Sequence, residues 1–289
     1  MEKVTITPSM AEKLLEGNTN NRNISKLQVD RLAKDMKAGN WQFNGETIKV
    51  TNDGTLLDGQ HRLKACVMSG TPFETAIVYD LPKNAIESID TGRKRGDNDI
   101  LKIKGFISSR ELVTVVKRLI LAEQGVNPAL AFESSKRSTI TTHDILEYCE
   151  SHPRSVEVIQ KVKAKNTTVR NLGITTSTVS FLFLLFEQIA GTDLATEFFE
   201  ILYDTDRSLT ATPVDVLRKT YWEQAAKRRA YSRRTSYDDP ILMIKAWNAY
   251  VTGKTVKTLT VYAKETYNPP EIKAPKIIAG DGFVESEGN

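Results

Sequence analysis

The spacing of apolar residues changes type several times within the first hundred positions. Apolar residues at helical intervals predict three short amphipathic helices, at residues 8–15, 25–38 and 60–69. Short β-rich runs predict four strands, at residues 4–6, 47–51, 55–57 and 73–79. Asn52-Asp53-Gly54 lies between two of these runs and predicts a tight hairpin turn. Strands and short helices are therefore mixed up to about Lys104.

Beyond this mixed region the pattern becomes almost entirely helical. Apolar residues keep helical spacing in the segments 110–124, 142–151, 156–165, 176–189, 194–203, 213–229 and 239–251. We therefore predict an α+β domain over residues 1–104, followed by an all-helical domain over residues 105–267. Residues 268–289 combine Pro, Gly and acidic residues with little apolar periodicity, so this tail is expected to be disordered or draped.

Composition narrows the class of protein only a little. The chain has 289 residues, and its 40 Lys and Arg against 36 Asp and Glu leave a net charge of +4, which neither demands nor excludes nucleic acid. Cys66 and Cys149 form no close pair and no Cys/His cluster, so we expect a reduced, cytoplasmic protein without zinc. The N-terminus lacks an apolar signal core. The longest apolar run, residues 179–186, is far shorter than the roughly 20 residues that span a bilayer, so no membrane partner is expected.

The main candidate for chemistry is Asp58-Gly59-Gln60-His61-Arg62, where a strand should pass directly into a helix. The first amides of a helix lack intrahelical partners, so such a turn is a ready anion site. Gly59 would let a phosphate approach the backbone, Arg62 can add a forked charged contact, and His61 can donate a hydrogen bond or transfer a proton. Asp58 could hold a divalent cation or orient His61.

Each of these residues also has an ordinary structural interpretation. Asp58-Gly59 fits a simple turn, His61 fits a hydrogen-bonded polar residue, and Arg62 fits a surface charge. We favour the anion site because the five residues follow an apolar strand and precede an amphipathic helix.

The order of elements around this segment resembles the ParB/sulfiredoxin superfamily. The resemblance covers about residues 3–104 and rests on Asn21-Arg22, the helix 24–37, Gly39-Asn40-Trp41, the strand 48–50 and residues 56–65. ParB proteins have a Gly-x-x-Arg element followed by a small residue at this place, and sulfiredoxins have Gly-Cys-His-Arg.

Two departures narrow the resemblance. Gln60 stands where sulfiredoxins have cysteine, which argues against sulfiredoxin chemistry, and no ParB-like helix-turn-helix is evident in the second half. The segment is similar to the phage and mobile-element branch with the Asp-Gly-Gln-His-Arg form, which includes the regulatory protein of DNA phosphorothioation systems.

The resemblance implies a nucleoside triphosphate site at Gly59, Gln60, His61 and Arg62, because members of the superfamily bind ATP or CTP at this turn. It also implies a second phosphate contact from Arg22, and DNA as a partner in a bacterial or phage-infected cell. Whether the chain forms a homodimer stays open.

A phosphotransferase of this kind needs a cation, here Mg²⁺, beside the phosphates, and a carboxylate that accepts the proton of the acceptor hydroxyl. Asp58 is the candidate metal ligand, and Glu46, just before the strand 48–50, is the candidate base. With His61 they form the predicted catalytic set. Glu46 is equally well explained as an exposed loop residue.

Two basic clusters extend the candidate site. Residues 90–95 (Asp-Thr-Gly-Arg-Lys-Arg) suit another phosphate at a helix entrance, with Arg95 as its ligand, and a solvated loop is the alternative. A second cluster, with Tyr221, Trp222 and Tyr231 nearby, suits a nucleic-acid backbone and unstacked bases. Its basic residues are Lys227, Arg228, Arg229, Arg233 and Arg234. A solvated helix end is the alternative there.

The sequence thus predicts a DNA-associated, nucleoside-triphosphate-binding protein that transfers a phosphoryl group, as a DNA-base kinase would, or hydrolyses the nucleotide. A non-catalytic DNA-binding regulator is the alternative from another class. A ParB-like nuclease is less well supported, because a metal nuclease gathers several carboxylates and this cluster offers one or two.

Overall fold

The chain divides into two compact units in a computed structural model that describes residues 3–19, 21, 23–89, 95–204, 206, 212–230 and 238–275. Within these ranges, the side chains of residues 88 and 227–230 are not described. Unit 1 comprises residues 1–96 and 137–147, and unit 2 comprises residues 97–136 and 148–289. The division after Gly96 precedes the boundary predicted at Lys104, and a later segment, residues 137–147, belongs with the first unit.

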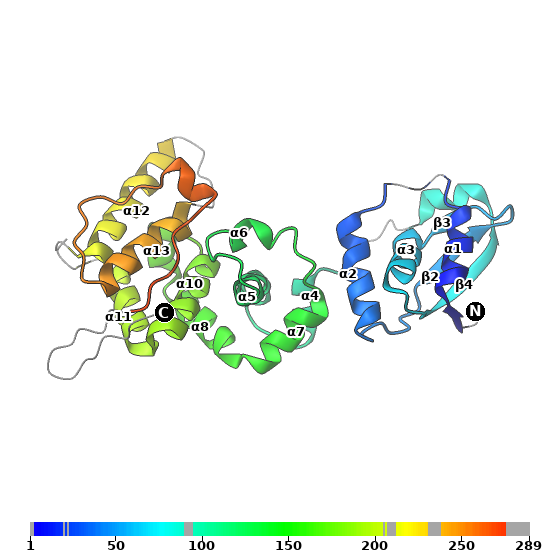
Figure 1. Cartoon of the computed structure of the whole chain (residues 1–289), viewed down its shortest axis with the longest axis horizontal. Coiled ribbons are helices and arrows are strands. Elements are labelled where there is room, and N and C mark those ends of the chain that lie inside the picture. The colour runs from blue at the N-terminus through cyan, green and yellow to red at the C-terminus, as the bar shows by residue number, and fades with distance from the viewer. Residues whose placement is uncertain are drawn as a thin grey trace, which may run out of the picture. The chain divides into compact units, whose positions relative to one another are not determined.

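Unit 1 is built on a mixed four-stranded sheet (Figure 1). Its order is β1 (Lys3–Ile6), β4 (Phe73–Leu81), β2 (Thr47–Thr51) and β3 (Leu56–Asp58). β2 runs parallel to β4, whereas the pairs β1/β4 and β2/β3 are antiparallel. The predicted hairpin joins β2 to β3, and Asp53 closes its turn by accepting hydrogen bonds from the hydroxyls of Thr51 and Thr55.

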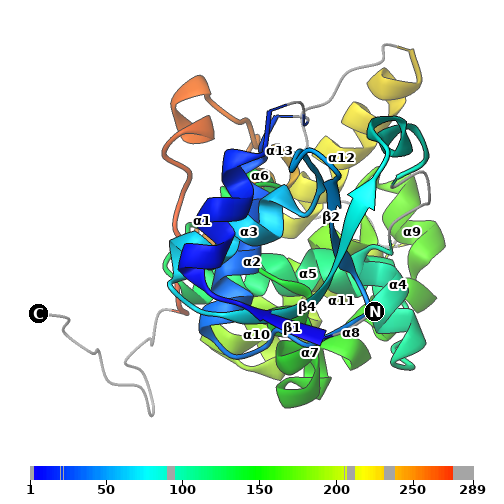
Figure 2. The same ribbon diagram turned by 90° about the vertical axis from the view of Figure 1, so that its right-hand side faces the viewer.

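Three helices cover one face of this sheet: α1 (Pro8–Glu16), α2 (Lys26–Lys37) and α3 (Gln60–Ser69), as Figure 2 shows. Each turns an apolar stripe inward, as the sequence spacing predicted. The buried core between helices and sheet consists of Ile6, Ala11, Val29, Ala33, Met36, Ile48, Val50, Leu56, Leu63, Ala65, Cys66 and Phe73. This packing fixes the point at which β3 passes into α3.

Residues 137–147 join unit 1 through polar contacts with α2. Arg31 donates from Nε and a terminal nitrogen to the carbonyl oxygen of Ser138, at 3.0 and 2.7 Å. Lys34 forms an ion pair with Asp144 at 2.6 Å. Earlier in the sequence, directly after β4, unit 1 contains the 3₁₀ helix η1 (Lys83–Ser88).

All regular elements among the described residues of unit 2 are helices, in agreement with the periodicity. They are α4 (Asp97–Ile103), α5 (Ser109–Glu123), α6 (Ala131–Ser134), the end of α7 (Thr142–Ser151), α8 (Pro153–Ala164), α9 (Asn166–Asn171), α10 (Thr176–Ala190), α11 (Thr192–Tyr203), α12 (Pro213–Ala230), α13 (Asp238–Val251) and the 3₁₀ helix η2 (Ala263–Thr266). The core of unit 2 forms around α10. Its Phe186 stacks on Trp247 of α13 with ring centroids 4.2 Å apart, and Phe198 of α11 packs edge-on to both rings.

The first part of the predicted tail is held against α13. The Asn248 side chain donates to the carbonyl oxygen of Glu271 and accepts from the amide of Lys273. Trp247 Nε1 donates to the carbonyl oxygen of Lys273 at 2.9 Å. These contacts hold residues 271–273 against α13, and residues 276–289 lie outside the described part of the chain.

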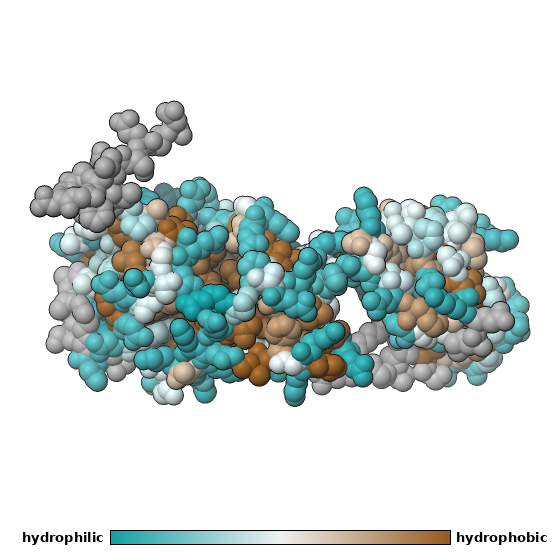
Figure 3. Space-filling model, turned by 90° about the horizontal axis from the view of Figure 1, so that it is seen from below, coloured by the Kyte–Doolittle hydropathy of each residue, from teal (hydrophilic) through white to brown (hydrophobic). Residues whose placement is uncertain are grey.

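Neither cysteine is paired, and both thiols are buried, Cys66 in unit 1 and Cys149 in unit 2. Within the described ranges, no helix is both long enough and apolar enough to cross a membrane. The face in Figure 3 is largely hydrophilic, with small apolar patches between the polar residues.

Candidate phosphate site at the turn between β3 and α3

Gly59 turns the chain between β3 and α3 in a conformation that side chains disfavour. Its φ is +103°, and a Cβ added there would lie 2.3 Å from Cδ1 of Ile48. The turn therefore needs glycine for packing against β2 before any ligand is considered. The Gly59 amide donates to Oδ1 of Asp58 at 2.7 Å, so the carboxylate folds back over the turn.

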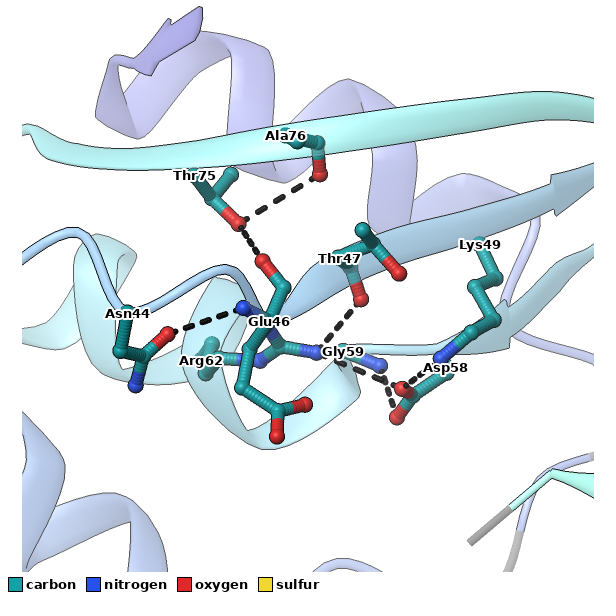
Figure 4. Close-up of polar contacts among 9 residues, drawn as sticks. All are labelled: Asn44, Glu46, Thr47, Lys49, Asp58, Gly59, Arg62, Thr75 and Ala76. Atoms are coloured by element: carbon teal, nitrogen blue, oxygen red, sulfur yellow. Dashed lines mark hydrogen bonds and ion pairs between the residues drawn. The ribbon is translucent and has the colours of Figure 1, made fainter. Parts of the chain in front are cut away.

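Asp58 lies directly opposite Lys49 in the β2/β3 register. Side chains opposite each other on antiparallel strands lie on the same face, and the Lys49 ammonium contacts Oδ2 of Asp58 at 2.9 Å (Figure 4). Four residues after Asp58, in the first turn of α3, Arg62 approaches the same oxygen at 3.4 Å. The one carboxylate is thus shared by two cations, and the group of three carries a net charge of +1.

Arg62 is anchored by the sheet. One of its terminal nitrogens donates to the carbonyl oxygen of Thr47 at 2.7 Å, and its side chain is only 12% exposed. The other terminal nitrogen, Nη1, is buried and has no hydrogen-bond partner among the described residues. An unpaired buried N–H of a charged group is costly, so this guanidinium retains unused capacity to bind an acceptor.

A pocket of about 280 Å³ opens at this turn, and we call it the turn pocket. Four consecutive residues of the predicted motif, Asp58 to His61, line it together with Leu57. Among the described residues, the rest of its lining comes from Asn21, Ile86 and Ile89. The pocket therefore combines the N-terminus of α3 with an apolar wall from the η1 segment.

Gln60 is buried and belongs to a chain of amide side chains. Asn18 donates to Oε1 of Gln60 at 3.2 Å, and Asn21 donates to Oδ1 of Asn18 and to the carbonyl oxygen of Leu56. This network ties the polar loop after α1 to β3. Its effect is to hold Asn21 at the edge of the turn pocket.

His61 is also buried, and its Nε2 accepts a hydrogen bond from the amide of Ser25 at 3.0 Å. Ser25 is the N-cap of α2, and its hydroxyl accepts from the amide of Gln28. His61 thus accepts from the amide of the N-cap residue. In a capping box, that acceptor is the side chain of a Glu or Gln at the third helical position. This bond requires an unprotonated Nε2, so that nitrogen has a structural task in addition to the catalytic one predicted from the sequence.

Replacing His61 with leucine is expected to lower the free energy of unfolding of unit 1 by about 1–3 kcal/mol, because the Ser25 amide loses its acceptor. His61→Gln should recover part of this loss, since a glutamine oxygen can accept in place of Nε2. Urea unfolding followed by fluorescence of Trp41, which packs on Phe73 in unit 1, measures both variants. Equal losses for leucine and glutamine would show that the hydrogen bond to Ser25 is not what stabilises α2.

Glu46 stands at the start of β2 but does not line the turn pocket. Its side chain is exposed, while its backbone oxygen accepts from the hydroxyl of Thr75 at 2.8 Å (Figure 4). The neighbouring carbonyl, that of Thr47, is the one bound by Arg62. The structure thus brings Glu46 to the vicinity of Arg62 through the backbone, without a described contact between its carboxylate and the motif.

Several predicted residues cannot be placed. Arg22, residues 90–94, Arg233 and Arg234 lie outside the described residues, as do the side chains of Lys227, Arg228 and Arg229. Arg95 is described and exposed, and it does not line the turn pocket.

A protein-held divalent cation does not fit the side chains at this turn. Asp58 is the single carboxylate among the described residues that line the turn pocket, and its oxygens already accept from the Gly59 amide, Lys49 and Arg62. No cluster of three or more His, Cys, Asp or Glu side chains suited to a metal occurs within the described part of the chain. We therefore derive no step that depends on Mg²⁺ held by Asp58.

The sequence reasoning missed two contributors to the site. Lys49 lies in the alternating pattern of β2, but counting residues back from the Asn52-Asp53-Gly54 turn pairs it with Leu57. It lies opposite Asp58 only because the β2/β3 register shifts between Lys49 and Val50. The apolar wall of Ile86 and Ile89 had no comparable signal, because it depends on how η1 returns to β3.

A scan of family models, a search of curated proteins and a search of solved structures each gave no match to this chain.

Proposed function

We propose that unit 1 is a ParB/sulfiredoxin-like domain that binds a nucleoside triphosphate, with the phosphates at the turn pocket. The observation that carries this proposal is the pocket itself, which is lined by Asp58 to His61 at the N-terminus of α3. Amides and dipole at a helix N-terminus favour an anion at this position. The turn pocket therefore lies at the motif that resembles the family.

Charge around the pocket supports the same ligand. Asp58 alone would repel a phosphate, but Lys49 and Arg62 compensate it and leave one positive charge in excess. Arg62 is not among the described residues that line the pocket, so its unpaired Nη1 would bind a phosphate oxygen only after the side chain reorients. Phosphate binding would then satisfy a buried donor that the protein alone leaves without a partner.

The apolar wall suits the rest of a nucleotide. Leu57, Ile86 and Ile89 line the pocket beside the motif, and Ile86 is 41% exposed. At about 280 Å³ the pocket is near the lower end of the usual range for ligand pockets, roughly 300–1,000 Å³. It therefore accommodates the phosphates, with the nucleoside extending along the isoleucines.

The geometry supports binding better than catalysis. The predicted base, Glu46, does not line the pocket, and Nε2 of the predicted proton carrier, His61, is bonded to Ser25. Phosphoryl transfer to a DNA base and nucleotide hydrolysis are thus further hypotheses. They require Glu46 or water to reach a bound phosphate.

Titration calorimetry with ATP, CTP, GTP and ADP, each in Mg²⁺ and in EDTA, tests the proposal. Ile86→Trp should fill the pocket from its exposed wall and weaken nucleotide binding at least tenfold. Asn84→Trp is the matched control, because Asn84 is exposed on the same 3₁₀ helix but does not line the pocket. The proposal would be overturned if none of the four nucleotides bound, or if the two tryptophan variants bound nucleotide with equal affinity.

A label-transfer assay distinguishes an enzyme from a non-catalytic regulator. Wild-type protein is incubated with γ-labelled nucleotide and DNA, and labelled phosphate is followed in solution and on the DNA. Release or transfer of the label that is lost in Glu46→Gln marks an enzyme. DNA affinity that changes with nucleotide, with no turnover, marks the non-catalytic regulator.

A further inference from the structure

A second pocket lies in unit 2, in the angle between α8, α10 and α11. Its volume is about 350 Å³, and its floor is formed by Val158 and Val162 of α8, Phe183 of α10 and Phe199 of α11. These four side chains are buried, so the floor is apolar and preformed by the core. We call this the aromatic-lysine pocket.

Three aromatic rings run continuously along this pocket. The rings of Phe183 and Phe199 are 5.3 Å apart at 41°, and those of Phe199 and Tyr203 are 6.1 Å apart at 37°. Tyr203 also lines a neighbouring hollow of about 410 Å³, so it stands between the two spaces. A flat apolar body can stack or pack edge-on against such a wall.

The hydroxyl of Tyr203 is buried and has no hydrogen-bond partner among the described residues. Burial raises the pKa of this phenol, so it is protonated and able to donate at neutral pH. A buried hydroxyl without a partner is destabilising, and native structures rarely keep one without a reason. A ligand that offers an acceptor here would satisfy it.

The described residues that line the pocket include three cations, Arg154, Lys161 and Lys165, and one carboxylate, Glu200. Arg154 is fully engaged with Glu187 and Glu157, and Lys165 lies 3.7 Å from Glu200. Lys161 also lines the pocket and is exposed. It forms no hydrogen bond or ion pair within 4 Å with any described residue, although its charge acts on the carboxylate of Glu187 from a longer distance. It is therefore the rim cation that remains available to an incoming anion.

We propose that the aromatic-lysine pocket binds a small aromatic molecule that carries one anionic group, such as an aromatic carboxylate. The aromatic body packs against Phe183 and Phe199, the anionic group pairs with Lys161, and an acceptor atom receives the Tyr203 hydroxyl. The site belongs wholly to unit 2 and is independent of nucleotide binding in unit 1.

Fluorescence titration with 1-anilinonaphthalene-8-sulfonate, an aromatic anion, tests this site in the full chain. We expect saturation at one probe per chain, and displacement by 1-naphthoate at concentrations at least tenfold lower than by uncharged 1-naphthalenemethanol. Lys161→Gln should weaken the probe by about 3- to 10-fold. Lys163→Gln is the matched control, because Lys163 lies on the same helix but contacts Ser108 and Glu111 instead of the pocket.

Tyr203→Phe distinguishes a ligand-binding hydroxyl from a structural one. Removing an unpartnered hydroxyl should leave the unfolding midpoint unchanged or higher, while displacement by 1-naphthoate requires several-fold more ligand. Non-saturable binding, or equal affinities in Lys161→Gln and Lys163→Gln, would overturn the proposal. So would probe binding that is lost in the unit 1 variant Ile86→Trp and kept in Lys161→Gln, because it would place the probe in the turn pocket.

Discussion

Replacing Asp215 with alanine is expected to lower the free energy of unfolding of unit 2 by about 3–5 kcal/mol. Asp215 forms an ion pair at 3.0 Å with Arg218, whose side chain has no exposed surface. Arg218 also donates to the carbonyl oxygens of Ile201 and Asp204, so it cannot leave the interior without breaking these bonds. Without Asp215, a buried positive charge would lose its counter-ion. Denaturant unfolding followed by the fluorescence of Trp222, which lies over the Arg218 guanidinium, and of Trp247 measures the loss.

A surface pair on the same helix provides the control. Lys219 and Glu223 are 3.9 Å apart and more than half exposed, so Glu223→Ala should change stability by less than about 0.5 kcal/mol. The double variant Asp215→Ala/Arg218→Met should lose less than Asp215→Ala alone, because it removes the stranded charge as well. A loss in Asp215→Ala no larger than that in Glu223→Ala would mean that backbone carbonyls alone compensate Arg218.

This ion pair illustrates what sequence periodicity could not predict. Asp215 and Arg218 are three residues apart on α12, a spacing that is usual for pairs on a solvated helix face. Whether that face meets water or protein depends on how α11 and α12 pack, and no local pattern encodes that contact. The apolar stripe of α12 was sufficient to predict the helix and insufficient to predict its most buried polar contact.

Elements whose signals are local were predicted well. The α7 helix coincides with the predicted residues 142–151, α3 with residues 60–69, and the hairpin turn with Asn52-Asp53-Gly54. Sheet order could not be inferred, because β2 pairs in parallel with β4, a strand that follows only after α3. The assignment of residues 137–147 to unit 1 likewise depends on distant contacts, those of Arg31 and Lys34 with Ser138 and Asp144.

The candidate site shows the same division between position and role. The turn at residues 58–62 and its pocket lie where the motif indicated. The partners of its side chains are distant in sequence: Thr47 for Arg62, Ser25 for His61 and Asn18 for Gln60. Each of these residues therefore holds the domain together, and Gln60 and His61 also line the pocket, so a substitution that abolishes binding is informative only when folding is measured beside it.

Gly59→Ala is expected to destabilise unit 1 by about 2–6 kcal/mol, from two separable causes. A backbone at φ +103° strains any residue with a Cβ by about 1–3 kcal/mol, and the new methyl would overlap Cδ1 of Ile48, for a further cost of about 1–3 kcal/mol. Gly70 provides the comparison, because it also has positive φ, +66°, but a Cβ added there would meet no atom within 4 Å. Gly70→Ala should cost only about 1 kcal/mol. Urea unfolding followed by Trp41 fluorescence measures both.

Ile48→Val removes the one methyl with which the new side chain collides, so Gly59→Ala/Ile48→Val should recover about 1–2 kcal/mol relative to the sum of the single changes. Additive single effects would instead assign the whole loss to backbone strain. The double variant also separates the two roles of Gly59. If it is folded and still binds nucleotide like wild type, glycine is required for packing against β2 alone. If it is folded and binds at least tenfold more weakly, close approach of a phosphate to this turn is part of recognition.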